Sequence, residues 1–203
     1  MSKTLITVGP EDQGRRMTLA EFEGAEGQPG HLYELSRGVV SVVDVPNRRH
    51  LALINALKRQ VHAYDLAHPG RLHTIATGRE CKILLPDLES ERHPDLAIYL
   101  TPPPEGEDFW ARWIPALVME VVSPGSEERD YVAKREEYLR FGVSEYWIVD
   151  ADKQEMLVLR RRSRKRWQEQ VVRPPEIYQT RWLPGLEFSI ALVFQAGEAA
   201  GNR

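Results

Sequence analysis

The stretch that decides the fold reads LVMEVVSPGSEERDYVAKREEYLRFGVSEYWIVD and runs from residue 117 to residue 150. Its apolar run at 117–122 is typical of a central strand, residues 130–141 have the pattern of a helix, and residues 145–149 form a further strand. Gly142 is placed to end the helix in the left-handed conformation.

Outward from this stretch, helices and strands follow one another along almost the whole chain. Thr18 and Glu21 have the spacing of a capping box, which predicts a short helix from residue 18. A second helix is expected at 47–67, with one buried face made of Leu51, Ile54, Leu57, Val61 and Tyr64. Strands are expected at 32–35, 39–45, 72–76, 82–85, 96–100, 156–160, 167–172 and 186–189. The proline-rich segment 101–115 is expected to be a loop, and residues 196–203 a frayed tail.

This order of elements predicts the fold class. Helices and strands are interleaved, so we expect an α/β fold of the mixed, α+β kind, with a mixed central sheet and helices packed on its faces. A chain of 203 residues is long enough for one domain of this type.

The composition excludes several classes of protein. Cys81 is the only cysteine, so an internal disulfide and a thiolate metal cluster are ruled out. No apolar run approaches the roughly 20 residues that span a bilayer, and residues 1–16 have no apolar core of signal-peptide length. We therefore expect a cytoplasmic protein with no membrane contact. Because the net charge is -3, any contact with nucleic acid must be local.

Glu120 interrupts the apolar run at 117–122. An ionised carboxylate in a strand core needs a hydrogen-bonded partner, a cation or a metal. Asp95, at the head of the strand that starts at residue 96, raises the same question. Two acids at neighbouring strand ends can share a divalent ion such as Mg²⁺. Taken singly, Asp95 could instead cap a turn and Glu120 could pair with an arginine.

Lys134 favours the metal-site interpretation. It shares a helical face with three aromatic residues, Tyr131, Tyr138 and Phe141. The other charged residues of this helix are expected on its other sides, namely Arg135, Glu136, Glu137 and Arg140. A lysine on the buried face either reaches solvent along its stem or brings its ammonium to the carboxylates, where it orients a water and stabilises a transition state.

Two further features are ambiguous from the residues alone. Glu34 lies in the apolar segment 32–35 and either contacts a metal or faces solvent. A basic run is either a nucleic-acid contact or a solvated hairpin tip, and consists of Arg160, Arg161, Arg162, Arg164, Lys165 and Arg166. No phosphate loop, serine elbow or dinucleotide fingerprint is present, so a nucleotide cofactor is not expected.

Together these residues resemble a known family. The pattern comprises Tyr33-Glu34-Leu35, His50, Pro94-Asp95, Glu120-Val121-Val122-Ser123-Pro124, Asp130, Lys134, Tyr138 and the segment from Gly142 to Trp147. It closely resembles the Uma2 family (DUF820) of bacterial restriction-endonuclease-like proteins, in the PD-(D/E)xK nuclease superfamily. The resemblance is strongest from Glu120 to Trp147.

The resemblance implies a restriction-endonuclease-like core at residues 18–190, after an N-terminal extension at 1–17 and before a C-terminal tail at 191–203. It implies that Asp95, Glu120 and the carbonyl of Val121 bind Mg²⁺ or Mn²⁺, and that Lys134 and Glu34 are catalytic. Supporting positions behind the ligands are His50, Ser123, Asp130 and Tyr138.

One residue departs from the superfamily pattern, because Val122 stands where the superfamily has its lysine. Lys134 on the following helix is expected to supply that group instead. The implied activity is hydrolysis of phosphodiester bonds in DNA, and the resemblance also implies a homodimer. An inactive DNA-binding or protein-interaction module is the alternative, and a protein that acts on RNA or branched DNA is a third.

Overall fold

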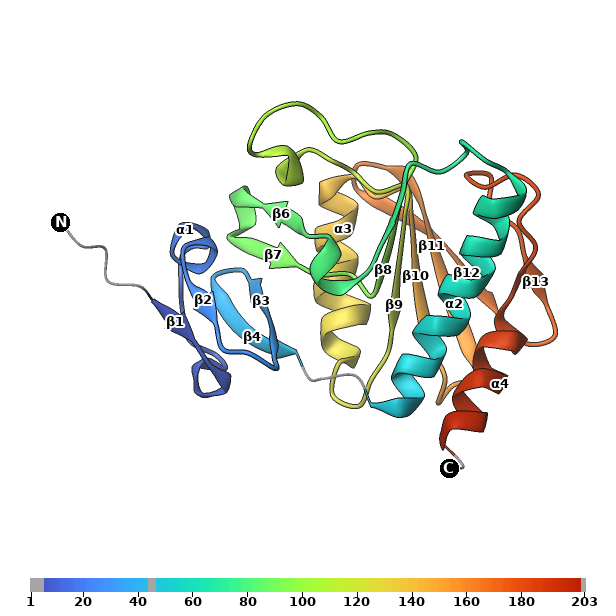
Figure 1. Ribbon diagram of the computed structural model, residues 1–203, viewed down its shortest axis with the longest axis horizontal. Helices are drawn as coiled ribbons and strands as arrows, with labels where there is room; N and C mark the ends of the chain where they lie inside the picture. The colour runs from blue at the N-terminus through green and yellow to red at the C-terminus, as the bar shows by residue number, and fades with distance from the viewer. Residues whose placement is uncertain (1–5, 44–46, 202–203) are drawn as a thin grey trace.

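A six-stranded mixed sheet forms the centre of the molecule (Figure 1). The computed structural model describes residues 6–43 and 47–201. In spatial order the strands are β12 (Arg166–Val172), β11 (Glu155–Ser163), β10 (Glu145–Asp150), β9 (Leu117–Val121), β8 (Leu96–Tyr99) and β5 (Thr74–Ala76). Only β9 and β10 run parallel, and the other neighbours are antiparallel. This confirms the predicted mixed sheet.

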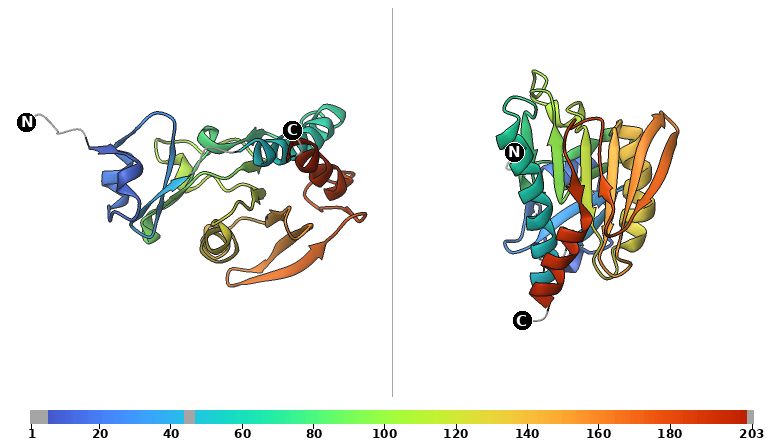
Figure 2. Two further views of the ribbon diagram at one scale, coloured as in Figure 1. Left: turned by 90° about the horizontal axis from the view of Figure 1, so that it is seen from below. Right: turned by 90° about the vertical axis from the view of Figure 1, so that its right-hand side faces the viewer.

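Helices cover both faces of this sheet (Figure 2). Because side chains alternate along a strand, Leu117, Met119 and Val121 of β9 face one way, into a core shared with α2 (Arg48–Ala67) and α4 (Ile190–Gly201). Val118 faces the other way, toward α3 (Lys134–Phe141). Glu120 is therefore on the α3 side of the sheet.

A second, four-stranded sheet packs beside α3. Its spatial order is β4 (Val39–Val43), β3 (Leu32–Ser36), β7 (Ser90–Arg92) and β6 (Ile83–Leu85). The remaining elements are α1 (Leu19–Glu23), the parallel pair β1 (Thr7–Val8) and β2 (Glu26–Gly27), and the pair β13 (Ile177–Tyr178) and β14 (Phe188–Ser189). There are also 3-10 turns at Pro10–Asp12, Gly78–Glu80, Pro86–Leu88 and Phe109–Ala111, and a π-helical turn at Arg129–Ala133 directly before α3. Each helix in residues 6–43 and 47–201 is too short or too polar to span a bilayer.

The local signals in the sequence correspond to observed caps and turns. Thr18 Oγ1 accepts from the Glu21 amide at 3.2 Å, and a Glu21 carboxylate oxygen accepts from the Thr18 amide at 2.8 Å, which completes the predicted capping box. Gly142 ends α3 with a φ of 110°. The predicted hairpin at 32–45 is present, although its last residues lie outside the described part of the chain.

Several expectations were wrong. Leu51 is half exposed because the buried face of α2 is centred on Leu53, Leu57 and Val61. The strand expected at 186–189 is shorter, at Phe188–Ser189, and pairs with β13 outside the main sheet. The expected frayed tail is largely the helix α4, whose Val193 and Phe194 are buried against α2; residues 202–203 lie outside the described range. The proposed boundaries at 17/18 and 190/191 stay predictions.

Strand β7 was missed, and with it the partner of Glu137. Glu137 was expected on an outer face of the helix but is fully buried, because Arg92 of β7 lies against it. The Arg92 Nε lies 2.6 Å from Glu137 Oε2, and its Nη1 lies 3.1 Å from Glu34 Oε2. One guanidinium thus ties β3 of the small sheet to α3.

We expect Arg92→Ala to lower the free energy of unfolding by about 3–5 kcal/mol, because it leaves two buried carboxylates without their shared cation. Chemical denaturation measures the change. The matched control is Arg140→Ala, which removes the exposed Arg140–Asp87 pair and should change stability by no more than about 1 kcal/mol. Equal effects in the two variants would show that the buried network does not hold the sheet to the helix.

Candidate functional site

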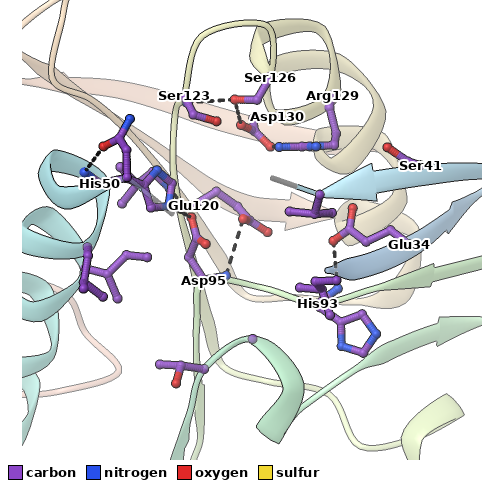
Figure 3. A pocket seen from close by; sticks show the side chains of 18 of the residues that line it. Glu34, Ser41, His50, His93, Asp95, Glu120, Ser123, Ser126, Arg129 and Asp130 are labelled. Atoms are coloured by element: carbon purple, nitrogen blue, oxygen red, sulfur yellow. Dashed lines mark hydrogen bonds and ion pairs between the residues drawn. The ribbon is translucent and has the colours of Figure 1, made fainter. Parts of the chain in front are cut away.

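A cleft of about 980 Å³ lies between α2, the small sheet and the loop that follows β9 (Figure 3). Its lining includes all four residues expected to be catalytic, namely Glu34, Asp95, Glu120 and Lys134. Glu34 comes from β3 and Asp95 from the segment that precedes β8. Glu120 comes from β9 and Lys134 from α3, so four separate parts of the chain meet in this cleft.

Asp95 and Glu120 lie side by side at the end of β9. The Val121 amide donates to Asp95 Oδ2 at 2.8 Å, and the Asp95 amide donates a long hydrogen bond of 3.4 Å to Glu120 Oε2. His50, in the first turn of α2, places its Nε2 3.5 Å from Asp95 Oδ2. Backbone amides and one histidine thereby fix the orientation of both carboxylates.

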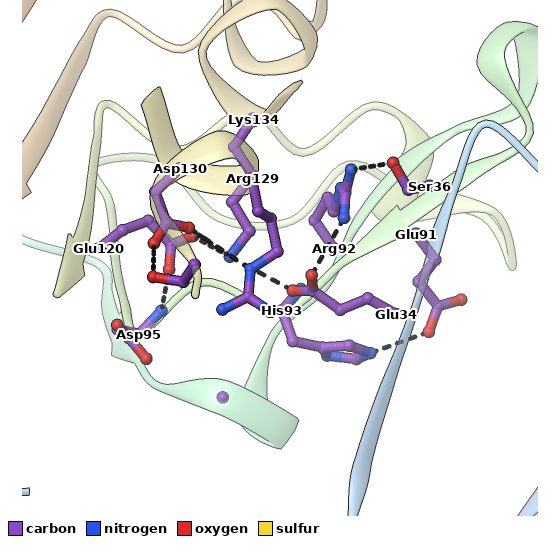
Figure 4. A network of polar contacts seen from close by, with 12 residues as sticks. Glu34, Ser36, Glu91, Arg92, His93, Asp95, Glu120, Arg129, Asp130 and Lys134 are labelled. Atoms are coloured by element: carbon purple, nitrogen blue, oxygen red, sulfur yellow. Dashed lines mark hydrogen bonds and ion pairs between the residues drawn. The ribbon is translucent and has the colours of Figure 1, made fainter. Parts of the chain in front are cut away.

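Lys134 is buried and reaches three carboxylates. Its Nζ lies 2.9 Å from Glu120 Oε1, 3.4 Å from Glu34 Oε1 and 3.7 Å from Asp130 Oδ1. The side chain is only 3% exposed, so the ammonium is held inside the molecule and does not reach out to solvent (Figure 4). The prediction that it lies within the buried helical face agrees with this position.

The supporting positions lie around these four residues. The Tyr138 hydroxyl donates to Glu120 Oε1 at 2.6 Å. Ser126 donates to Asp130 Oδ2 at 2.6 Å, and the Ser123 amide donates to Ser126 Oγ at 2.9 Å. The loop after β9 therefore orients Asp130, which in turn faces Lys134.

The pKa values of the two buried acids Glu120 and Glu34 shift in opposite directions. Burial raises the pKa of Glu120, and the charges of Asp95 and Asp130 add to this against the pull of Lys134. Burial also opposes ionisation of Glu34, but Lys134 and Arg92 outweigh it and lower the pKa of Glu34 to about 2. Although burial disfavours its charge, the carboxylates around Lys134 raise its pKa. Lys134 is therefore a cation at neutral pH.

The charges of this cluster do not balance. Five carboxylates face three cationic side chains: Glu34, Asp95, Glu120, Asp130 and Glu137 against Arg92, Arg129 and Lys134. Glu34 and Glu137 share the single charge of Arg92, Arg129 lies nearest Asp130, and Lys134 lies nearest Glu120. Among the described residues, Asp95 is therefore the carboxylate of this cluster that no lysine or arginine pairs with, and its partner is His50. In the described residues, Oδ1 of Asp95 accepts no hydrogen bond, and Glu120 Oε2 accepts only the long one.

This donor set fits a hard divalent ion. Mg²⁺ is typically held by one or two carboxylates with waters completing its shell. In the described residues, no three or more histidine, cysteine or acidic side chains are grouped so that they could hold a metal ion by themselves. An open site with two carboxylates leaves positions for water and substrate, which suits catalysis better than a structural role.

The basic run is not brought to this cleft. Strand β11 pairs antiparallel with β10, and Arg160 is level with Glu145, which is level with Leu117 at the start of β9. The tip between β11 and β12 therefore lies beyond the start of β9, whereas Glu120 lies near its end. In addition, the Nε of Arg160 donates a hydrogen bond of 3.1 Å to the Tyr178 hydroxyl oxygen. The possible contact of this run with nucleic acid stays a prediction.

Sequence reasoning missed several residues of the site. The sequence pattern predicts no role for Arg92, Ser126 or Arg129, although all three lie in or beside the cleft. The segment Ser90-Glu91-Arg92 has no apolar pattern, and all three residues are nevertheless buried.

Comparison with known proteins identifies a similar fold. A crystal structure of a putative nuclease belonging to DUF820 from Anabaena variabilis ATCC 29413 superposes with a TM-score of 0.70 at 17% sequence identity. The match covers 89% of this chain and 99% of that one. At this identity the likeness establishes the shared fold. No curated protein was found to match the chain.

The central mixed sheet, with helices on both faces, defines a protein of the mixed α+β class. The family follows from the sequence match: the model of the Uma2 family, described as "Putative restriction endonuclease", matches residues 19–191. The chain belongs to the Uma2 family.

The lowered pKa of Glu34 leads to a pH-dependent stability. Its ionised form stabilises the fold above its ordinary pKa of 4.5, and this contribution is lost as the pH falls toward 2. We expect the wild type to exceed Glu34→Gln in unfolding free energy by about 3 kcal/mol at neutral pH. Urea denaturation at a series of pH values should show this difference shrinking from about pH 4.5 downward. A difference that does not change with pH would contradict the assignment.

Proposed function

We propose that the protein is a metal-dependent endodeoxyribonuclease that hydrolyses phosphodiester bonds in DNA. The single observation that carries the proposal is the convergence of Asp95, Glu120 and Lys134 in one cleft, with Lys134 Nζ 2.9 Å from Glu120. Membership of the Uma2 family, described as "Putative restriction endonuclease", supports a nuclease role.

Asp95 and Glu120 are the residues that would hold Mg²⁺ or Mn²⁺, and the carbonyl of Val121 is a third candidate ligand. Such an ion, when bound, polarises a phosphate oxygen and makes a coordinated water more acidic. Among the described residues no lysine or arginine pairs with Asp95, and this is the electrostatic reason for a cation at this end of the cleft.

The protein's own residues supply the rest of the chemistry. Lys134 stays protonated, so it is a hydrogen-bond donor and a positive charge rather than a base. In this position its ammonium can orient an attacking water and stabilise negative charge that develops on the phosphate. Tyr138 holds Glu120, and the loop through Ser126 holds Asp130, so the donors and acceptors are fixed before substrate enters.

The lysine on α3 can replace the one expected on the strand. Glu120 and Val122 point to the same side of β9, the side that α3 covers. Val122 packs in the apolar cluster around Tyr138, so the strand position is used for packing. Lys134 approaches the same carboxylate from the helix above that face.

The rival function is a nuclease fold without turnover that binds DNA or a protein, and Val122 at the superfamily's lysine position is the observation in its favour. Assays on plasmid, single-stranded DNA, branched DNA and RNA with Mn²⁺ separate the two functions and identify the substrate. A homodimer, expected from the family resemblance, is tested by light scattering on the same preparation.

We expect Glu120→Gln to fold normally and to lose binding of Mn²⁺ in calorimetry. A glutamine keeps the shape of the side chain and a hydrogen-bond acceptor for Tyr138, but it removes the charge that a divalent ion needs. Glu136→Gln, an exposed change on α3, is the control and should bind Mn²⁺ like the wild type. Unchanged affinity in Glu120→Gln would remove Glu120 from the metal site.

We expect Lys134→Ala to lower the rate of plasmid cleavage by about 10²–10³ because a preorganised donor to the transition state is lost. Arg140→Ala, at the exposed end of the same helix, should cleave at the wild-type rate. Circular dichroism of each variant establishes that the fold is retained. If the folded Lys134→Ala protein cleaves as fast as the wild type, the lysine has no role in the reaction.

A further inference from the structure

Arg129 is a cation of the cleft to which the reaction outlined above gives no role. It lies at the start of the helical segment that carries Lys134 and lines the same cleft as Asp95 and Glu120. Its side chain is three-quarters buried. Figure 4 shows it projecting toward the space between Glu34 and the Asp95–Glu120 pair.

The guanidinium of Arg129 is poorly satisfied. Within the described residues its side chain makes no hydrogen bond, its Nε is buried without a partner, and its nearest carboxylate oxygen is Asp130 Oδ1 at 3.6 Å. A guanidinium has five N–H donors in a planar fork that matches the oxygens of a phosphate. Burying such a group without partners is unfavourable, so an acceptor that enters the cleft would be bound strongly.

A wide helical turn puts Arg129 on the same side as Lys134. Residues Arg129–Ala133 form one turn of π-helix, and the Lys134 amide donates to the Arg129 carbonyl five residues earlier. In this turn residue i+5 is the hydrogen-bonded partner, so positions 129 and 134 lie one above the other. In an ordinary α-helix the residues above 129 would be 132 and 133.

The simpler explanation is that Arg129 only neutralises the carboxylates. The other two buried cations show what neutralisation looks like here. Arg92 lies 2.6 Å from Glu137, and Lys134 lies 2.9 Å from Glu120, both at hydrogen-bond distance. Arg129 stays at 3.6 Å from Asp130 although that Asp130 oxygen is itself buried without a hydrogen bond. The N–H groups of Arg129 can therefore donate to an acceptor other than Asp130.

We propose that Arg129 binds a non-bridging oxygen of a backbone phosphate of the nucleic acid strand in the cleft. The inference rests on the proposed nuclease function and adds a residue that touches the substrate. Arg129 fixes the strand above the Asp95–Glu120 pair, while Lys134 acts at the reacting phosphate.

The test measures binding separately from cleavage. A fluorescein-labelled 20-base-pair DNA duplex is titrated with wild type, Arg129→Gln and Arg129→Lys in Ca²⁺ and in EDTA, and anisotropy is followed at several salt concentrations. Arg135→Gln is the matched control, since Arg135 lies six residues on and pairs with Glu169 outside the cleft. Thermal unfolding of every variant is recorded.

Arg129→Gln should bind about tenfold more weakly, as expected for loss of one charged hydrogen bond. The plot of log K against log salt should be less steep by about 0.9, the value of one phosphate contact on duplex DNA. Arg129→Lys keeps the charge, so it should keep the wild-type slope and recover part of the affinity. A purely structural arginine would not change the slope.

Cleavage of plasmid in Mn²⁺ is measured in parallel, so that the two hypotheses can fail separately. If the wild type cuts and Arg129→Gln keeps the wild-type affinity and slope, the role of Arg129 is wrong and the nuclease function stands. If the wild type cuts nothing but the slope falls in Arg129→Gln and not in Arg135→Gln, Arg129 is a phosphate contact and the nuclease function is wrong.

Discussion

The burial of Lys134 against Glu120 is the constraint on which the rest of the site depends. Removing an ammonium and a carboxylate from water costs several kcal/mol for each ion, and their attraction offsets this only when geometry and hydrogen bonds are good. Here the Tyr138 hydroxyl and the carboxylates of Glu34 and Asp130 complete the surroundings of the pair. The pair therefore fixes where α3 can sit on the sheet.

The same constraint explains why the small sheet belongs to the site. Glu34 extends from β3 toward Lys134, and Arg92 of β7 holds Glu34 and Glu137 together. If the small sheet moved away, α3 would keep a buried carboxylate at Glu137 without its cation. Through these contacts, the position of the small sheet affects the geometry at Asp95 and Glu120. Neither of these two residues lies in the small sheet itself.

The sequence allowed the centre of the site to be predicted, because charges in apolar patterns are conspicuous. Glu120 in an apolar strand and Lys134 among aromatic residues of one helical face both stand out, and the structure places them 2.9 Å apart. Residues whose burial depends on distant partners could not be found in this way. Strand β7 is polar in sequence, and two of its residues, Arg92 and Ser90, are the partners of the buried Glu137. The π turn at Arg129–Ala133 also has no periodicity that reveals it, so Arg129 was overlooked.

A lysine on a helix is positioned by different forces from a lysine on a strand. Two residues after the acid on a strand, the pleat of the backbone would place it beside the acid. On α3 the ammonium reaches Glu120 through a long flexible stem, so its position is set by the acids that surround it. Asp130 and Glu34 therefore help to hold the ammonium of Lys134 in place, which a strand lysine would not require. Ser126 contributes because it orients Asp130 through a hydrogen bond. The three acids around Lys134, which are Glu34, Glu120 and Asp130, thus determine where its ammonium lies.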